Sequence, residues 1–306
     1  MSAEGSKKAI VAALLANAGI AVAKFAGWAI TGSSSMLAEA VHSVADTSNQ
    51  GLLLFGQHRA RKEANQLHPF GYGRSRYFYS FVVALVLFSL GSLFALYEGY
   101  EKIKHPHDLE SPMVAVIILV VAVGLESYSF ATAFRESKPL KGDVSWWRFI
   151  RTSRNPELPV VLMEDTGALI GLVLALSGVG LATITGDPIW DAIGTLCIGV
   201  LLGVIAIILI VEMQSALIGE GATESDERAI RETLGAAPGI ERIIHMKTQY
   251  LGPDEMLVAA KIAITPGSSA LELAAAIDAA EASVRERVPV ARVIYLEPDI
   301  DRGPGA

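Results

Sequence analysis

Long apolar stretches separated by short polar segments make up the first two thirds of the chain. Six of them have the length of a membrane-spanning helix, because about 20 helical residues cross a hydrocarbon core of about 30 Å. These stretches lie at residues 9–31, 35–57, 77–99, 112–134, 159–183 and 188–212. The pattern predicts a domain of six transmembrane helices over residues 1–214.

Beyond residue 214 the apolar positions follow the shorter periods of a water-soluble domain. Residues 223–234 begin with Thr223 and an acidic first turn, which is a helix-start signal. Residues 240–250 and 256–264 are rich in Ile and Val and flank a turn sequence, so they predict a hairpin. A helical period at 268–287 and a short strand at 291–296 complete the order αββαβ. We therefore predict a small ferredoxin-like α+β domain at residues 215–300 and a tail at 301–306.

Composition supports a membrane protein. Of the 306 residues, 52% are hydrophobic and only 19% are charged, against about 25% in soluble proteins. The net charge is −7, which disfavours a nucleic-acid partner because such a surface needs clustered positive charge. Cys197 is the single cysteine, so no disulfide forms within the chain.

The distribution of Lys and Arg predicts the orientation in the membrane. Thirteen of these residues lie in three segments: Lys7 and Lys8 precede the first apolar stretch, and the others lie in the second and fourth loops. The remaining loops contain only Lys102 and Lys104. Basic residues in short loops favour the cytoplasmic side, so both termini are predicted to be cytoplasmic. The N-terminal segment has no signal-peptide or Arg-rich transit pattern, which favours a bacterial plasma membrane.

Ionisable side chains inside the predicted spans are costly, at about 2.5–3.5 kcal/mol each near the bilayer centre, and therefore indicate function. Glu39, His42, Asp46 and Asn49 are spaced by 3, 4 and 3 residues, which places them on one stripe of the second helix. Because imidazole nitrogen and carboxylate oxygen suit Zn²⁺, Mn²⁺, Fe²⁺ or Co²⁺, this stripe predicts a divalent-cation site.

Other spans contribute further candidate groups. Glu164 and Asp165 are adjacent in the fifth span and point about 100° apart, so we favour Asp165 as a ligand. Glu126 is either an acid of the ion pathway or a partner in helix packing. Lys24 is interpreted as a counter-charge or as a side chain that extends to the membrane surface. Glu212 is predicted to pair with Arg74 or with Arg76 of the second loop.

Several sequence motifs, taken in their order along the chain, resemble the cation diffusion facilitator family of divalent-metal transporters. They are HSVAD at 42–46, HPFGYGRSRYFYSF at 68–81, SWWRFIRTSRNPELP at 145–159 and MED at 163–165. The resemblance covers about residues 8–300, and the motifs are similar to the branch that includes zinc transporter nine. It implies a homodimer in the lipid bilayer that exports a divalent cation, with Zn²⁺ favoured, in exchange for protons by alternating access.

The resemblance places His42, Asp46 and Asp165 on family ligand positions. Val161 stands where family members usually have a His, so Glu164, Asn49 and water remain candidates for the fourth ligand. Tyr72 stands where a second loop His is common, and the C-terminal domain contains only His245, so we predict no zinc cluster there.

Three alternatives to a transporter follow from the same residues. A cation channel would share the predicted topology, and a metal-sensing membrane scaffold would share the soluble domain. An enzyme would need a motif such as HExxH or a nucleophile elbow, neither of which occurs. We therefore predict a transporter with no catalytic cofactor, whose metal ion is the transported substrate.

Overall fold

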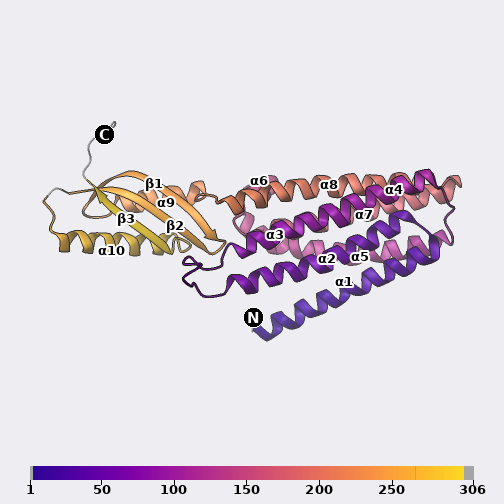
Figure 1. Ribbon diagram of the computed structural model, residues 1–306, viewed down its shortest axis with the longest axis horizontal. Coiled ribbons are helices and arrows are strands. Elements are labelled where there is room, and N and C mark those ends of the chain that lie inside the picture. Colours follow the sequence, from indigo (N-terminus) through magenta and orange to yellow (C-terminus); the bar gives the residue numbers. More distant parts are fainter. Residues whose placement is uncertain (1–2, 266, 300–306) are drawn as a thin grey trace. The chain divides into compact units, whose positions relative to one another are not determined.

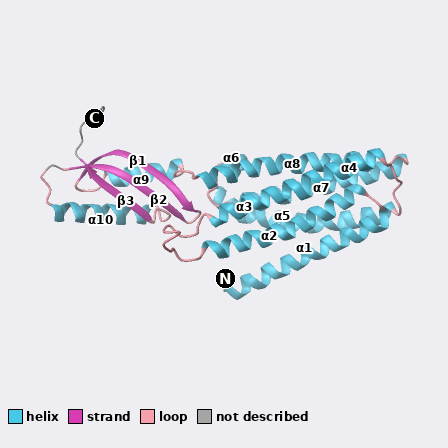
Figure 2. Ribbon diagram, in the orientation of Figure 1, coloured by secondary structure: helices cyan, strands magenta, loops and turns pink. Residues whose placement is uncertain are grey.

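The computed structural model describes residues 3–265 and 267–299. Its first part is helical, with α1 (Ala3–Thr31), α2 (Ser34–Ala60), α3 (Ser75–Val86), the π-helix η1 (Leu87–Leu93), α4 (Phe94–Lys104), α5 (Pro112–Lys141), α6 (Trp146–Thr152), α7 (Glu157–Thr185) and α8 (Ile189–Ile218). The second part contains α9 (Glu224–Gly235), β1 (Ile240–Gly252), β2 (Glu255–Ile264), α10 (Ala270–Arg287) and β3 (Val293–Asp299) (Figures 1 and 2).

A long helix or helical run covers each of the six predicted membrane segments. Among residues 3–265 and 267–299, four of these runs are by length and composition able to cross a membrane, namely Ser75–Lys104, Pro112–Pro139, Glu157–Thr185 and Ile189–Ile218. α2 has 27 residues, but its polar stripe lowers its apolar content. The described part thus confirms a helical membrane-type domain, and the number of six spans stays a prediction. The side chains of Lys7 and Lys8 and the tail at 301–306 lie outside the described part.

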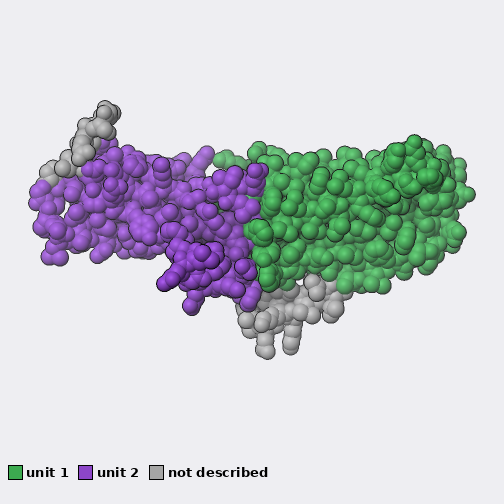
Figure 3. Space-filling view, viewed as in Figure 1, with its two compact units in different colours: residues 1–56, 78–213 green, residues 57–77, 214–306 purple. Residues whose placement is uncertain are grey.

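Two compact units divide the chain, and Figure 3 shows them in different colours. The first contains Met1–Gly56 and Phe78–Met213, and the second contains Gln57–Tyr77 and Gln214–Ala306. The loop that follows α2 therefore belongs to the same unit as the C-terminal residues. The predicted boundary between two domains near residue 214 stays a prediction.

Glycine allows α7 and α8 to cross closely within the first unit. A Cβ atom on Gly178 would lie 3.0 Å from the carbonyl oxygen of Trp190, and one on Gly194 would lie 3.2 Å from that of Leu174. Contacts this short between backbones are typical of helix pairs in membranes, where small residues promote association. Close packing thus accounts for these two glycines.

The order αββαβ predicted for the C-terminal residues is confirmed by α9, β1, β2, α10 and β3. The sheet has the order β1-β2-β3, with β1 and β2 antiparallel and β2 and β3 parallel. The two helices contact each other and share one hydrophobic core with the sheet. Ile230, Leu234, Met256, Val258 and Val284 are among its fully buried members. The assignment of this domain to the ferredoxin-like topology stays a prediction.

A short helix that the sequence pattern did not predict, α6, lies in the loop between α5 and α7. Ser145 caps it by accepting a hydrogen bond from the backbone N–H of Arg148 at 3.2 Å. Arg151 in its last turn donates to Glu212 Oε1 of α8 at 2.9 Å. This loop is therefore attached to α8 by an ion pair instead of extending freely.

Candidate functional site

The polar stripe of α2 faces the interior of the first unit, as its spacing predicts. The side chains of Glu39, His42 and Asn49 are fully buried, and that of Asp46 is 17% exposed. His42 Nε2 lies 3.6 Å from Asp46 Oδ2, one helical turn away. This separation exceeds a hydrogen bond, so the imidazole and the carboxylate are neighbours without a direct bond.

The two acids of α7 point to different helices. Asn49 Nδ2 of α2 donates to Glu164 Oε1 at 2.6 Å, and Ser129 Oγ of α5 donates to Asp165 Oδ2 at 3.1 Å. Two adjacent residues on a helix are separated by about 100°, which explains why they reach different partners. Three helices, α2, α5 and α7, therefore contribute side chains to the candidate site.

Several buried polar atoms of α2 have no hydrogen-bond partner within residues 3–265 and 267–299. They are Glu39 Oε1, His42 Nδ1 and Nε2, Asp46 Oδ1 and Asn49 Oδ1. An unsatisfied buried polar atom costs about 1–3 kcal/mol, so five of them along one stripe would be a large penalty for a purely structural element. Imidazole nitrogens, carboxylate oxygens and amide oxygens are all atoms that can bind a metal ion, so the stripe has the chemistry of a candidate ligand site.

Lys24 of α1 supplies the counter-charge expected for the stripe. Its ammonium donates to Glu39 Oε2 at 3.1 Å and to Ser43 Oγ at 2.7 Å, and the side chain is fully buried. On the other side, a Cβ atom at Gly171 of α7 would lie 2.6 Å from Glu39 Oε1. Gly171 therefore leaves room for the Glu39 carboxylate, which is fixed between α1 and α7.

We expect Lys24→Met to lower the free energy of unfolding by about 3 kcal/mol, because it leaves the Glu39 carboxylate buried without its cation. The double variant Lys24→Met/Glu39→Gln should regain most of that loss, since it removes both charges. Unfolding of the detergent-solubilised protein, followed by circular dichroism in denaturant, measures both changes. The exposed Lys104→Met is the control. Equal stability of the single variant and the wild type would contradict a structural role for the pair.

The candidate groups form pairs, and they do not converge on one point. Asp46 lies within electrostatic range of Glu126 and Asp165, and Asp165 within range of Glu126. In the part of the chain that the structure describes, however, no three His, Cys, Asp or Glu side chains are close enough together to hold a metal ion. A metal ion at this position would therefore have to draw the side chains of α2 and α7 closer together.

Glu212, Arg76 and His68, which the sequence places outside the α2 stripe, contact side chains that are not part of the candidate metal site. Glu212 accepts from Arg151, and Arg76 Nη1 donates to Asp254 Oδ2 at 2.7 Å. Pairing of Glu212 with Arg74 or Arg76 stays a prediction. The ring of His68 contacts that of Tyr72, with centroids 4.5 Å apart.

A second buried polar cluster, which was not predicted from the sequence, lies at the start of α2. Asp191 Oδ2 of α8 accepts from the backbone N–H of Ser34 at 2.8 Å and from its hydroxyl at 3.2 Å. Asp191 Oδ1 accepts from Ser33 Oγ at 2.9 Å and also from Ser35 Oγ. Lys102 Nζ of α4 lies 3.4 Å from Asp191 Oδ2. The signal in the sequence was the run of three serines where α2 begins, because serine is favoured at the start of a helix.

Comparison with known proteins gives consistent matches to metal transporters. The family described as "Cation efflux transmembrane domain" matches residues 10–218. The mouse (Mus musculus) "Proton-coupled zinc antiporter SLC30A9, mitochondrial" is 33% identical over 252 residues, which cover 81% of this chain and 44% of that protein. "Metal tolerance protein C4" of Arabidopsis thaliana is 30% identical over 261 residues, 84% of this chain and 57% of that protein.

The chain thus spans about half the length of these curated relatives. Among solved structures, "MamM-CTD 215-293" matches 26% of this chain and 98% of its own, with 18% sequence identity and a TM-score of 0.24.

Proposed function

The chain belongs to the cation efflux family, and on that premise we propose that it exports a divalent metal cation, with Zn²⁺ favoured, in exchange for protons. It is an integral, multi-pass membrane protein of a transporter family. The observation that carries the proposal is the buried stripe of α2, in which both His42 ring nitrogens and one oxygen each of Glu39, Asp46 and Asn49 lack hydrogen-bond partners in the described part of the chain. The names of the relatives support zinc as the ion and protons as the counter-substrate.

We propose His42 and Asp46 of α2 and Asp165 of α7 as metal ligands. A neutral imidazole and carboxylates fit Zn²⁺, and the absence of thiolate disfavours copper(I). Asn49 and Glu164 are hydrogen-bonded to each other at 2.6 Å, so either one can supply an oxygen once that bond opens. They therefore remain the candidates, with water, for the ligand that Val161 does not provide.

Coupling to protons follows from shared ligands. A metal ion binds only deprotonated carboxylates and neutral imidazole, so its binding releases protons from the same atoms. If the empty site takes up protons before it returns to the other side of the membrane, each outward metal movement is accompanied by inward proton movement. Alternate approach and separation of α2 and α7 would expose the site to one side at a time.

The test is metal uptake by proteoliposomes that contain a pH-sensitive dye, with Zn²⁺ and Mn²⁺ compared. We expect Zn²⁺ entry into the vesicles to be accompanied by proton exit from them. A pH gradient with the more acidic side inside the vesicles should accelerate Zn²⁺ entry. Protein-free liposomes provide the control. Uptake that is insensitive to the pH gradient and causes no proton movement would instead identify a channel, and no uptake of either ion would favour a metal-sensing scaffold.

Assembly and orientation complete the proposal. We propose a homodimer with both chain ends on the cytoplasmic side, supported by the family and by the excess of Lys and Arg in the second and fourth loops. The bacterial plasma membrane stays a prediction, and the animal relatives are mitochondrial by name.

A further inference from the structure

A pocket of about 700 Å³ lies within the second unit, apart from the stripe of α2. Its walls are formed by the end of α2 and the loop that follows it, by the turn between β1 and β2, and by the start of β3. Pockets of about 300–1,000 Å³ are typical of small-molecule sites. The pocket is therefore large enough for an organic ligand, and its lining shows which chemistry it would accept.

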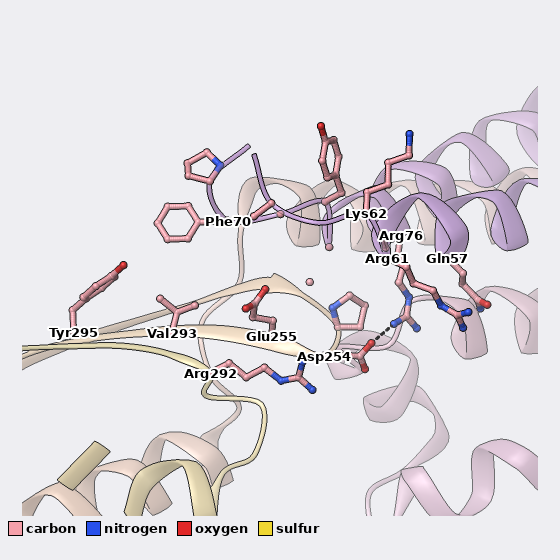
Figure 4. A pocket seen from close by; sticks show the side chains of 18 residues that line it. Gln57, Arg61, Lys62, Phe70, Arg76, Asp254, Glu255, Arg292, Val293 and Tyr295 are labelled. Atoms are coloured by element: carbon pink, nitrogen blue, oxygen red, sulfur yellow. Dashed lines mark hydrogen bonds and ion pairs between the residues drawn. The ribbon is translucent and has the colours of Figure 1, made fainter. Parts of the chain in front are cut away.

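One end of the pocket is cationic. Figure 4 shows the guanidinium group of Arg76 directed at Asp254, with that of Arg292 on the other side of Asp254 and that of Arg61 near Gln57. Arg76 is bonded to Asp254, whereas the side chains of Arg61 and Arg292 form no ion pair or hydrogen bond with any described residue. Guanidinium groups bind phosphate through paired hydrogen bonds, so this end suits a phosphate group.

The other end is aromatic. Phe70 of the loop and Tyr295 of β3 lie at the same end of the pocket in Figure 4, and they are 46% and 60% exposed. Exposed aromatic rings beside a cationic site are the arrangement on which nucleic-acid bases stack. This end would therefore hold a flat ring attached to the phosphate.

An unpaired carboxylate lies between the two ends. Glu255 is only partly exposed and has no ion pair or side-chain hydrogen bond in the described part of the chain. A carboxylate in the middle of an anion site is unfavourable unless it accepts hydrogen bonds from the ligand. Acidic side chains bind ribose hydroxyls in this way in dinucleotide sites.

From this juxtaposition we infer that the pocket binds a nucleotide of the nucleoside diphosphate class, with its phosphates on Arg61 and Arg292, its ribose on Glu255 and its base against Phe70 and Tyr295. The bound nucleotide connects the loop at residues 57–77 with the turn and strand of the αββαβ domain. Because α2 ends in this pocket, the nucleotide also contacts the helix that carries the candidate metal ligands.

The experiment measures binding of radiolabelled ADP to the full, detergent-solubilised chain by equilibrium dialysis. We expect saturable binding that Arg292→Gln weakens about tenfold, because a charge-assisted hydrogen bond is lost. Tyr295→Ala should weaken ADP binding while leaving the binding of pyrophosphate unchanged. Both positions are exposed, so the fold should tolerate the changes. Lys247→Gln removes an exposed positive charge outside the pocket and should leave binding unchanged.

Three outcomes would overturn the inference. The first is an absence of saturable ADP binding. The second is pyrophosphate binding as tight as ADP binding, together with ADP binding that Tyr295→Ala does not change. The third is displacement of ADP by vesicles of phosphatidylcholine and phosphatidylglycerol. The second identifies a simple anion site, and the third identifies a site for a lipid headgroup. Because the assay detects binding directly, it is independent of whether the chain transports metal.

Discussion

Asp46→Asn is expected to reduce the initial rate of Zn²⁺ uptake into proteoliposomes about 100-fold. The substitution keeps the shape of the side chain but removes the negative charge on which the proposed exchange of metal for protons depends. Loss of a group that merely orients a ligand already costs about 10–100-fold in metal affinity, so loss of a ligand should cost at least as much. Equilibrium zinc binding should weaken in parallel, and binding should release fewer protons than in the wild type.

Ser48→Ala is the matched control for Asp46→Asn. Ser48 is an exposed residue on α2, two positions away, and its hydroxyl donates to the carbonyl of Val44 at 2.9 Å. We expect uptake by this variant to equal that of the wild type. Wild-type uptake by Asp46→Asn would show that the stripe serves helix packing and that the metal binds elsewhere.

Asp191→Ala is expected to lower the free energy of unfolding by about 5 kcal/mol, the largest stability effect that we predict. The carboxylate accepts hydrogen bonds from three consecutive serines and lies 3.4 Å from the ammonium of Lys102. Its removal leaves the Lys102 ammonium, which is 2% exposed, with the carbonyl of Gly32 as its remaining hydrogen-bond acceptor among the described residues. Denaturant unfolding of the detergent-solubilised protein measures the loss.

Asp187→Ala provides the comparison for this cluster. Asp187 is exposed, and its side chain accepts one hydrogen bond from the backbone N–H of Ile189, so we expect a loss of about 1 kcal/mol. The double variant Lys102→Met/Asp191→Ala should be less destabilised than the sum of its single variants, because the two charges interact directly. Additive losses would show that Asp191 acts only as a helix cap.

Much of the fold was predictable because it depends on periodicity over many residues. An apolar stretch near 20 residues leaves the backbone few alternatives to a helix in lipid, and the four apolar helices found follow such stretches. In the C-terminal part, residues 253–254 of the predicted turn sequence separate β1 and β2, and the two residues before them belong to β1. In β2, buried positions alternate with partly buried ones, as expected for a strand with one face on a hydrophobic core.

Features that depend on a few local bonds were missed. α6 has only seven residues, too few for a helical period to be recognised. The π-helix at Leu87–Leu93 has an apolar sequence that equally suits an α-helix. The Asp191 cluster joins residues that are more than 150 positions apart in the chain, so the sequence does not show that Asp191 and the serines are in contact.

The sequence predicted which residues of α2 belong to the candidate site, but not which side chains of other helices they contact. The spacing of 3, 4 and 3 placed the α2 stripe on one buried face, and the structure buries it. Spacing along one helix does not reveal which residue on another helix lies opposite. Glu39 consequently pairs with Lys24, and Asn49 pairs with Glu164 instead of Asp165. The roles of these residues as metal ligands stay a proposal.

The buried Lys24–Glu39 pair also limits how strongly the voltage across the membrane can act on transport. A net charge that crosses the membrane field gains or loses about 2.3 kcal/mol per 100 mV. Because Lys24 and Glu39 carry opposite charges 3.1 Å apart, the pair adds no net charge that a movement of α1 and α2 would carry through this field. If the proposed exchange moves two protons for each Zn²⁺, no net charge crosses the membrane in a full cycle, and the membrane potential does not contribute to the driving force.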